Sequence, residues 1–156
     1  MKGNDKLLEL LNGLLADELT AINQYMVHSE MAENWGYGKL KALVRSRSIT
    51  EMKHAEKLIE RILFLEGIPI VSRLNEIKIG ADVAKQFTND LAAEMSAVKN
   101  YNAAIKVATE VGDNATKDML EGILKQEDQH VNEIEEKRDQ IEQMGLQNLL
   151  VTLTGA

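Results

Sequence analysis

Two short motifs in this chain combine a carboxylate with an imidazole at a spacing that suits metal binding. The first runs from Glu51 to His54 and the second from Glu127 to His130, and together they contain two of the three histidines in the chain. Residues three apart on a helix share one face and lie about 4.5 Å apart along the axis. Each motif therefore predicts two ligands directed at the same point, which is half of a metal site.

A further glutamate precedes the glutamate of each motif by 33 residues. Glu18 stands before the first motif and Glu94 before the second, so the two sets of residues are 76 positions apart. The same offset relates Tyr25 to Tyr101. This internal repeat predicts two similar helical hairpins, each of which carries three potential ligands.

Each pair of glutamates also brackets a turn signal. Residues equidistant from the turn of an antiparallel helix pair lie at the same level along it. The midpoint of the first pair falls in segment 34–38, which contains two glycines, and the midpoint of the second falls beside Gly112. Glycine commonly ends a helix. Each single glutamate should therefore face a Glu-x-x-His motif across a helix pair.

The composition indicates a globular, helical protein. At 156 residues the chain suits one domain spanning 1–156, and 44% hydrophobic with 28% charged residues is typical of soluble proteins. The single proline and the 4% aromatic content favour helix. With 18 basic and 25 acidic residues the net charge is −7, which argues against nucleic acid as a partner and favours cations.

The residue types also exclude several classes of site. The chain has no cysteine, which rules out disulfides, thiolate zinc sites and thiolate-held iron–sulfur clusters. No apolar run approaches the roughly 18 residues of a membrane span, and the first residues do not form a secretory signal. A cytoplasmic location without membrane contact is therefore expected.

Apolar periodicity predicts four long helices and a long connection between the second and the third. The first helix should begin near Asp5 as its N-cap, and a stripe on the second takes Arg47 together with the first metal motif. Gly67 and Pro69 begin a connection long enough to join opposite ends of a bundle. The expected fold is all-α, a four-helix bundle with this crossover and a short C-terminal fifth helix, for which a loosely held tail is the alternative. The helices are expected at residues 5–33, 38–65, 82–111, 115–144 and 146–154.

Six residues are the candidate metal ligands and catalytic residues: Glu18, Glu51, His54, Glu94, Glu127 and His130. For any one glutamate, a solvated helix face is the ordinary explanation. All six lie on core-facing stripes in a repeated register, which favours a site with two metal ions. Four carboxylates balance two divalent cations, and oxygen-rich ligation with one imidazole per ion favours iron or manganese over copper or structural zinc. The expected reaction is paired oxidation of ferrous ions.

Four segments carry a resemblance to a known family. They are residues 21–25 (AINQY), 51–55 (EMKHA), 59–67 (IERILFLEG) and 144–148 (MGLQN). Through them the sequence resembles bacterioferritin, the haem-containing branch of the ferritins, over almost the whole chain. The resemblance implies a ferritin-like bundle in which the six candidate ligands form a ferroxidase centre for two iron ions, bridged by Glu51 and Glu127.

The resemblance also implies partners and an assembly. Fe(II) would be oxidised by oxygen or hydrogen peroxide, and the ferric product would be stored as mineral inside a hollow shell. That shell would be a homo-oligomer of about twenty-four subunits built from two-fold dimers. Haem would help electrons from a small ferredoxin-type partner reach the mineral for iron release.

Met52 is the residue through which the resemblance implies a second cofactor. It lies one position after Glu51, so it points away from the metal face of its helix. The resemblance implies that its thioether is an axial ligand of a b-type haem shared between two subunits at a two-fold interface. From composition alone, a methionine at such a position more commonly fills a gap in packing.

Four other residues have smaller claims to a role. Tyr25 lies on the same face as Glu18 and is either an ordinary core tyrosine or a residue that hydrogen-bonds or supplies an electron near the site. His28 has no glutamate one turn earlier and is interpreted as a surface or packing histidine. Ser46 and Thr50 stand where some bacterioferritins carry the histidine and aspartate of an additional inner-surface iron site. The resemblance therefore leaves that additional site in doubt.

Rival interpretations fit parts of the same pattern. A small di-iron oxidase or peroxide scavenger would use the same ligands without storing mineral. A structural or haem-binding bundle would hold no metal in its acidic cluster. A mini-ferritin is disfavoured, because its metal site lies between subunits and the register here brings all six ligands together within one chain.

Overall fold

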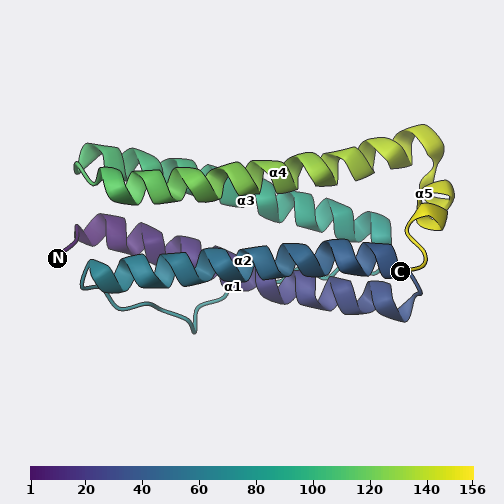
Figure 1. Cartoon of the computed structure of the whole chain (residues 1–156), viewed down its shortest axis with the longest axis horizontal. Helices are drawn as coiled ribbons and strands as arrows, with labels where there is room; N and C mark the ends of the chain where they lie inside the picture. Colours follow the sequence, from purple (N-terminus) through teal and green to yellow (C-terminus); the bar gives the residue numbers. More distant parts are fainter.

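Helix is the only regular secondary structure in the protein. The computed structural model describes residues 1–156, which form five helices and no strand (Figure 1). The helices are α1 (Asp5–Asn34), α2 (Gly38–Phe64), α3 (Val83–Glu110), α4 (Asn114–Met144) and α5 (Leu146–Thr152). The all-α prediction is confirmed, and every predicted helix boundary agrees with the structure within two residues.

The predicted N-cap of the first helix is wrong by one residue. Asn4, not Asp5, caps α1, because its extended backbone lets the side-chain oxygen accept a hydrogen bond from the Leu7 N–H. Asp5 is instead the first helical residue, where its negative charge faces the positive end of the helix dipole.

The four long helices form two antiparallel hairpins, α1–α2 and α3–α4, which lie side by side (Figure 1). Gly36 ends the first helix of one hairpin with φ of 82°, and Gly112 does the same in the other with φ of 74°. Both are in the left-handed region, which glycine adopts without a Cβ clash. The two turns lie at opposite ends of the bundle (Figure 1). The turn positions predicted from the repeat therefore match the structure.

An extended crossover carries the chain from the end of α2 back along the bundle to the start of α3, as expected (Figure 1). Peptide groups of this segment, from Ile68 to Gly80, hydrogen-bond with buried polar side chains spaced along α1. Those side chains belong to Asn12, Thr20, Gln24 and His28. The crossover is thus tied down along most of its length.

His28 has no exposed surface and belongs to these ties. Its Nε2 atom accepts a hydrogen bond from the Gly80 N–H at 3.0 Å, and its Nδ1 atom lies 2.9 Å from Asp90 Oδ1 on α3. Of the two interpretations of this histidine, the structure favours packing over a surface position.

The apolar core is divided into two clusters along the bundle. One contains Leu11, Leu58 and Leu120, and the other contains Tyr25 and Phe87. The six candidate ligands lie in the layer between them, because each helix places its glutamate or Glu-x-x-His motif near its middle. Apolar packing on both sides therefore positions a polar layer deep inside the protein.

The fifth helix covers one end of the bundle (Figure 1). Leu149 and Leu153 are 2% and 7% exposed and pack into the second apolar cluster. The Leu153 carbonyl also accepts a hydrogen bond from the Lys39 N–H of α2. The short fifth helix is therefore a packed element and not a loose tail. None of the five helices combines the length and apolar content needed to cross a membrane.

Candidate metal centre

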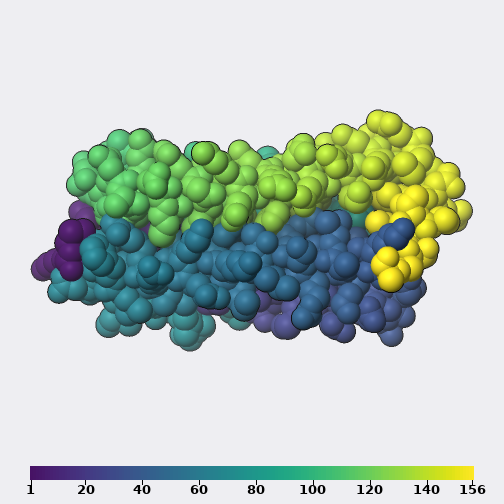
Figure 2. Space-filling view, in the orientation of Figure 1, coloured from purple at the N-terminus to yellow at the C-terminus, as the bar shows by residue number.

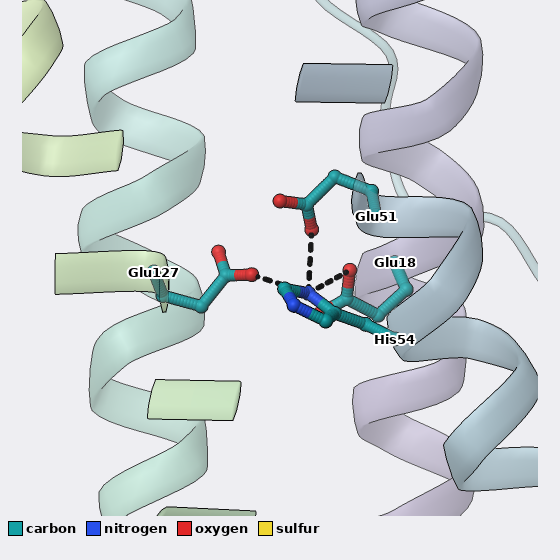
Figure 3. Close-up of side chains that lie close together, drawn as sticks. All are labelled: Glu18, Glu51, His54 and Glu127. Atoms are coloured by element: carbon teal, nitrogen blue, oxygen red, sulfur yellow. Dashed lines mark ion pairs between the residues drawn. The ribbon is translucent and has the colours of Figure 1, made fainter. Parts of the chain in front are cut away.

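The structure brings all six candidate ligands together in the middle of the bundle. One comes from α1, two from α2, one from α3 and two from α4, and none is more than 7% exposed. They are Glu18, Glu51, His54, Glu94, Glu127 and His130. Figure 3 shows Glu18, Glu51 and Glu127 directed at the ring of His54 from three different helices.

The six residues form two overlapping groups of potential ligands. Within each group, one atom from every residue lies within 4.8 Å of the others. Glu18 and His54 belong only to the first group, and Glu94 and His130 only to the second. Glu51 and Glu127 belong to both groups. Two metal ions held by these groups would therefore share two carboxylates.

The two imidazoles present the same atom to the cluster. His54 Nδ1 lies 2.8 Å from Glu127 Oε1 and 3.5 Å from Glu18 Oε2. His130 Nδ1 lies 2.9 Å from Glu51 Oε1 and 3.4 Å from Glu94 Oε1. Neutral imidazole with a free Nδ1 lone pair is a common metal ligand.

Gln126 orients His54 from outside the cluster, a role that the sequence did not predict. Its side-chain Oε1, which can only accept, is the hydrogen-bond partner of His54 Nε2. The proton of a neutral His54 therefore belongs on Nε2, which leaves Nδ1 free for a metal ion. The sequence carries no signal for this contact, because Gln126 is one of many polar residues on α4.

Glu18 and Glu94, the outer carboxylates, each belong to one ligand group only. Two buried tyrosines hold one oxygen of each. The Tyr25 hydroxyl donates to Glu94 Oε1, and the Tyr101 hydroxyl donates to Glu18 Oε1 at 2.6 Å. Each bond runs from one hairpin to the other. Tyr25 was interpreted either as a core tyrosine or as a residue that hydrogen-bonds near the site. The structure shows both features, because its ring is fully buried and its hydroxyl binds Glu94. Tyr101 was not assigned a role from the sequence, although its place in the repeat could have indicated one.

Each of the six residues carries one buried polar atom without a hydrogen-bond partner. The atoms are Glu18 Oε2, Glu51 Oε1, His54 Nδ1, Glu94 Oε2, Glu127 Oε1 and His130 Nδ1. An unsatisfied buried polar group costs about 1–3 kcal/mol. These atoms converge on one space, and four carboxylates with two imidazoles suit two divalent cations that prefer oxygen ligands. The donor set therefore fits a pair of iron ions.

Burial of the carboxyl groups, and their closeness to the two imidazoles, make the metal-free cluster retain protons. Burial, together with the charge of Glu51, raises the pKa of Glu18 well above its usual range, and burial raises the pKa of Glu127 to about 12. Burial opposes ionisation of Glu51 too, but the neighbouring Glu18 and both histidines lower its pKa. Burial would lower the pKa of each imidazole, yet the surrounding carboxyl groups raise the pKa of His54 to about 12 and that of His130 to about 9.

A cavity of about 250 Å³ reaches the carboxylates from the side of α1 and α3. Glu18, Glu51, Glu94 and Glu127 line its inner part, and crossover residues 75, 76 and 78 line it as well. The carboxylate cluster is thus next to a space large enough for small ions and water.

Met52, the candidate haem ligand, lies on a different surface of the protein. Its side chain is 47% exposed on α2, and Ile49 and Leu63 on the same helix are 40% and 58% exposed. Ser46 and Thr50 lie elsewhere on α2, where they line a second cavity beside His130. The seven predicted site residues therefore divide into a buried group of six and one exposed thioether.

A family model and several known proteins match this chain and agree on its family. The family model described as "Ferritin-like domain" matches residues 8–144. Bacterioferritin of Rhodobacter capsulatus is 42% identical over 147 residues, covering 94% of this chain and 91% of the relative. Bacterioferritins of Mycolicibacterium paratuberculosis and Streptomyces coelicolor are 38% and 37% identical, over 94% and 93% of this chain and 92% and 87% of theirs. With this coverage and a matching four-helix bundle, the chain belongs to the ferritin-like family and, within it, to the bacterioferritins.

Proposed function

We propose that this protein stores iron and oxidises Fe(II) at the six-residue cluster. The observation that carries the proposal is the set of six buried polar atoms without hydrogen-bond partners, one on each candidate ligand. A folded protein rarely retains so many unsatisfied groups at one point unless a ligand satisfies them. Membership of the bacterioferritins supports iron as that ligand.

In this proposal each residue has a defined task. Glu18 and His54 hold one ferrous ion, Glu94 and His130 hold the other, and Glu51 with Glu127 bridge the two. Four carboxylates carry a charge of −4, which two divalent ions neutralise, so the loaded site is balanced within the low-dielectric interior. Because Glu18, Glu127 and both histidines retain protons in the metal-free protein, iron binding must release protons.

The proposed reaction removes one electron from each of two ferrous ions. Hydrogen peroxide accepts both electrons and two protons to give two molecules of water, and oxygen accepts the same electrons and protons to give hydrogen peroxide. The protein favours the ferric product because hard carboxylate oxygens stabilise the higher charge. Tyr25 and Tyr101 keep the outer carboxylates aligned by holding one oxygen of each.

Storage and haem are the parts of the proposal that need a second copy of the chain. Storage requires a hollow homo-oligomer of about twenty-four subunits assembled from two-fold dimers. Met52 would bind a b-type haem there, since a soft thioether on an exposed apolar stripe suits an iron porphyrin shared by two copies. When bound, the haem would carry electrons from a small ferredoxin-type partner toward the mineral.

The direct test is an anaerobic Fe(II) titration of metal-free protein, followed by exposure to air. The wild type should saturate at two ions per chain, one for each ligand group, and then oxidise them rapidly. Glu127→Ala should lose both properties because it removes a carboxylate shared by both groups. Glu142→Ala, an exposed position on the same helix, is the matched control and should behave as wild type. Equal oxidation rates in all three proteins would contradict the proposal.

The main alternative is a di-iron oxidase that stores no mineral. Both functions share the cluster, so only the fate of the product separates them. Addition of many more Fe(II) ions than the cluster holds should produce electron-dense particles of uniform size in a storage protein. Oxidised iron that precipitates outside the protein would favour the oxidase instead.

A further inference from the structure

Arg47 on α2 carries a buried positive charge that makes no hydrogen bond. Its side chain is 2% exposed, and its Nε, Nη1 and Nη2 atoms have no hydrogen-bond partner. Glu133 provides the nearest carboxylate, but its Oε2 atom lies 3.8 Å from Nη2, beyond hydrogen-bond distance. The guanidinium group packs over the Tyr25 ring, 5.3 Å from its centroid. This cation–π contact offsets only part of the desolvation of an arginine, which keeps its charge in protein interiors.

A polar cavity of about 190 Å³ adjoins Arg47 between α2 and α4. Figure 2 views the molecule from the face on which α4 lies above α2. The lining residues are Leu43, Ser46, Arg47, Thr50, Gln126, Gln129, His130 and Glu133. Only one of them is a carboxylate, so the cavity differs in charge from the acidic cavity on the α1–α3 side.

We propose that this cavity binds a small oxyanion, for which inorganic phosphate is the representative, and that Arg47 is its main ligand. A guanidinium group presents N–H donors in a fork that matches two oxygens of a phosphate. The Ser46 hydroxyl is a further donor. So is the Gln126 amide, because the Gln126 oxygen is already occupied by His54 and its NH₂ group remains for the cavity. A cation is disfavoured at the same place by the guanidinium charge.

The acidic neighbours do not prevent anion binding. Glu133 faces the cavity, but the Gln129 side chain donates to its Oε1 atom at 3.1 Å. His130 lines the cavity on one side and belongs to the metal cluster on the other. A site loaded with two ferrous ions is neutral, and oxidation to ferric ions adds two positive charges beside the bound anion. This coupling rests on the proposed function, whereas binding of the anion to Arg47 does not.

The test is an isothermal titration of the metal-free protein with inorganic phosphate at constant ionic strength, compared with Arg47→Met. The wild type should bind one phosphate per chain with saturation. Arg47→Met should bind about ten- to a hundredfold more weakly, because it loses the charge-assisted hydrogen bonds. Arg45→Met is the matched control, since it removes the same charge from an exposed position two residues away and should bind as wild type.

Stability and a second variant keep the test decisive. In phosphate-free buffer, Arg47→Met should unfold at the same temperature as wild type or higher, because a buried charge without hydrogen bonds has been removed. Arg47→Lys keeps the charge without the fork and should bind more weakly than wild type; it replaces Arg47→Met in the comparison if the latter does not fold. Absence of saturable phosphate binding in the wild type, or wild-type affinity in the folded Arg47 variant, would overturn the proposal. Because no iron is present, either result leaves the ferroxidase proposal to its own experiment.

Discussion

The two hairpins of this protein are nearly equivalent where they meet and different elsewhere. At the cluster, His54 Nδ1 lies 2.8 Å from Glu127 Oε1 in the opposite hairpin, and His130 Nδ1 lies 2.9 Å from Glu51 Oε1. Their contacts with the outer carboxylates are 3.5 Å and 3.4 Å. Each hairpin also sends a tyrosine to the outer glutamate of the other. The cluster therefore has an approximate two-fold symmetry within one chain.

Away from the cluster, the same repeat carries different residues. The first hairpin has Arg47 and Met52 where the second has Ile123 and Asp128. It also has His28, which ties the crossover to α1. The equivalence is thus confined to the layer where both hairpins contribute to shared ligand groups. Residues outside that layer belong to no shared ligand group, so the two hairpins carry different residues there.

The largest expected effect comes from removing the two outer glutamates, one at a time, which tests this equivalence. Glu18→Ala and Glu94→Ala should each reduce Fe(II) binding from two ions per chain to one, because each residue belongs to one ligand group only. Both should also abolish paired oxidation. An anaerobic titration with each variant measures the stoichiometry, with Glu142→Ala as the control. A clear difference between the two variants would break the symmetry.

The dependence of stability on pH should separate the two histidines. The pKa of His130 is raised from 6.5 to about 9 in the folded state, and that of His54 to about 12. A raised folded-state pKa gives stability that is complete below the unfolded value of 6.5 and is lost as pH rises to the folded value. The His130 contribution, about 3 kcal/mol for a shift of this size, should therefore disappear by pH 9, while the His54 contribution continues to fall above it.

Urea unfolding of metal-free protein between pH 6 and 11 tests this difference. His130→Gln should remove the part of the decline that ends near pH 9. His54→Gln should make the decline above pH 9 less steep, and the remaining decline belongs to Glu127, whose pKa is also raised to about 12. Stability that rises with pH in this range would contradict the retention of protons by the folded cluster.

A smaller effect is expected from the tyrosines that cross between the hairpins. Tyr25→Phe and Tyr101→Phe each free one carboxylate oxygen, of Glu94 and Glu18 respectively. Each variant should weaken binding of the ion nearest that carboxylate about tenfold, the lower end of the usual effect of such supporting residues. Fe(II) titration measures the loss, and Tyr37→Phe at the first turn is the control. A much larger loss in one variant than in the other would show that one hairpin dominates.

The smallest effect on the bundle itself is expected at Met52 and Asp128, which occupy equivalent positions. Both are exposed, so Met52→Leu and Asp128→Asn should each change the free energy of unfolding by less than about 0.5 kcal/mol. They should differ in haem binding. Titration with haem should give the absorbance changes of thioether ligation with wild type and Asp128→Asn, but not with Met52→Leu. The same spectrum in all three proteins would remove Met52 from the haem proposal.

Much of the fold and most of the cluster could be predicted, because their signals are local and repeated. Apolar periodicity predicted each helix within two residues of its observed bounds. The 33-residue spacing of the glutamates and the glycines between them predicted which residues face each other. Helix geometry then converts a spacing along the chain into a position on one face, so the six candidate ligands were found before any contact was known.

Residues that act through a single contact between distant segments could not be found in this way. Gln126 orients His54, Tyr101 holds Glu18, and Arg47 lies beside a cavity without a hydrogen-bond partner. All three features depend on helix rotation and side-chain rotamers. The periodicity had placed Arg47 on a core-facing stripe, but an arginine there could equally have reached solvent or a carboxylate. The sequence alone therefore determined the helices, the turns and the clustering of the six candidate ligands through local, repeated spacing. The tertiary structure decided which of their atoms remain unsatisfied, because only the packing of four helices sets the distances between residues far apart in the chain.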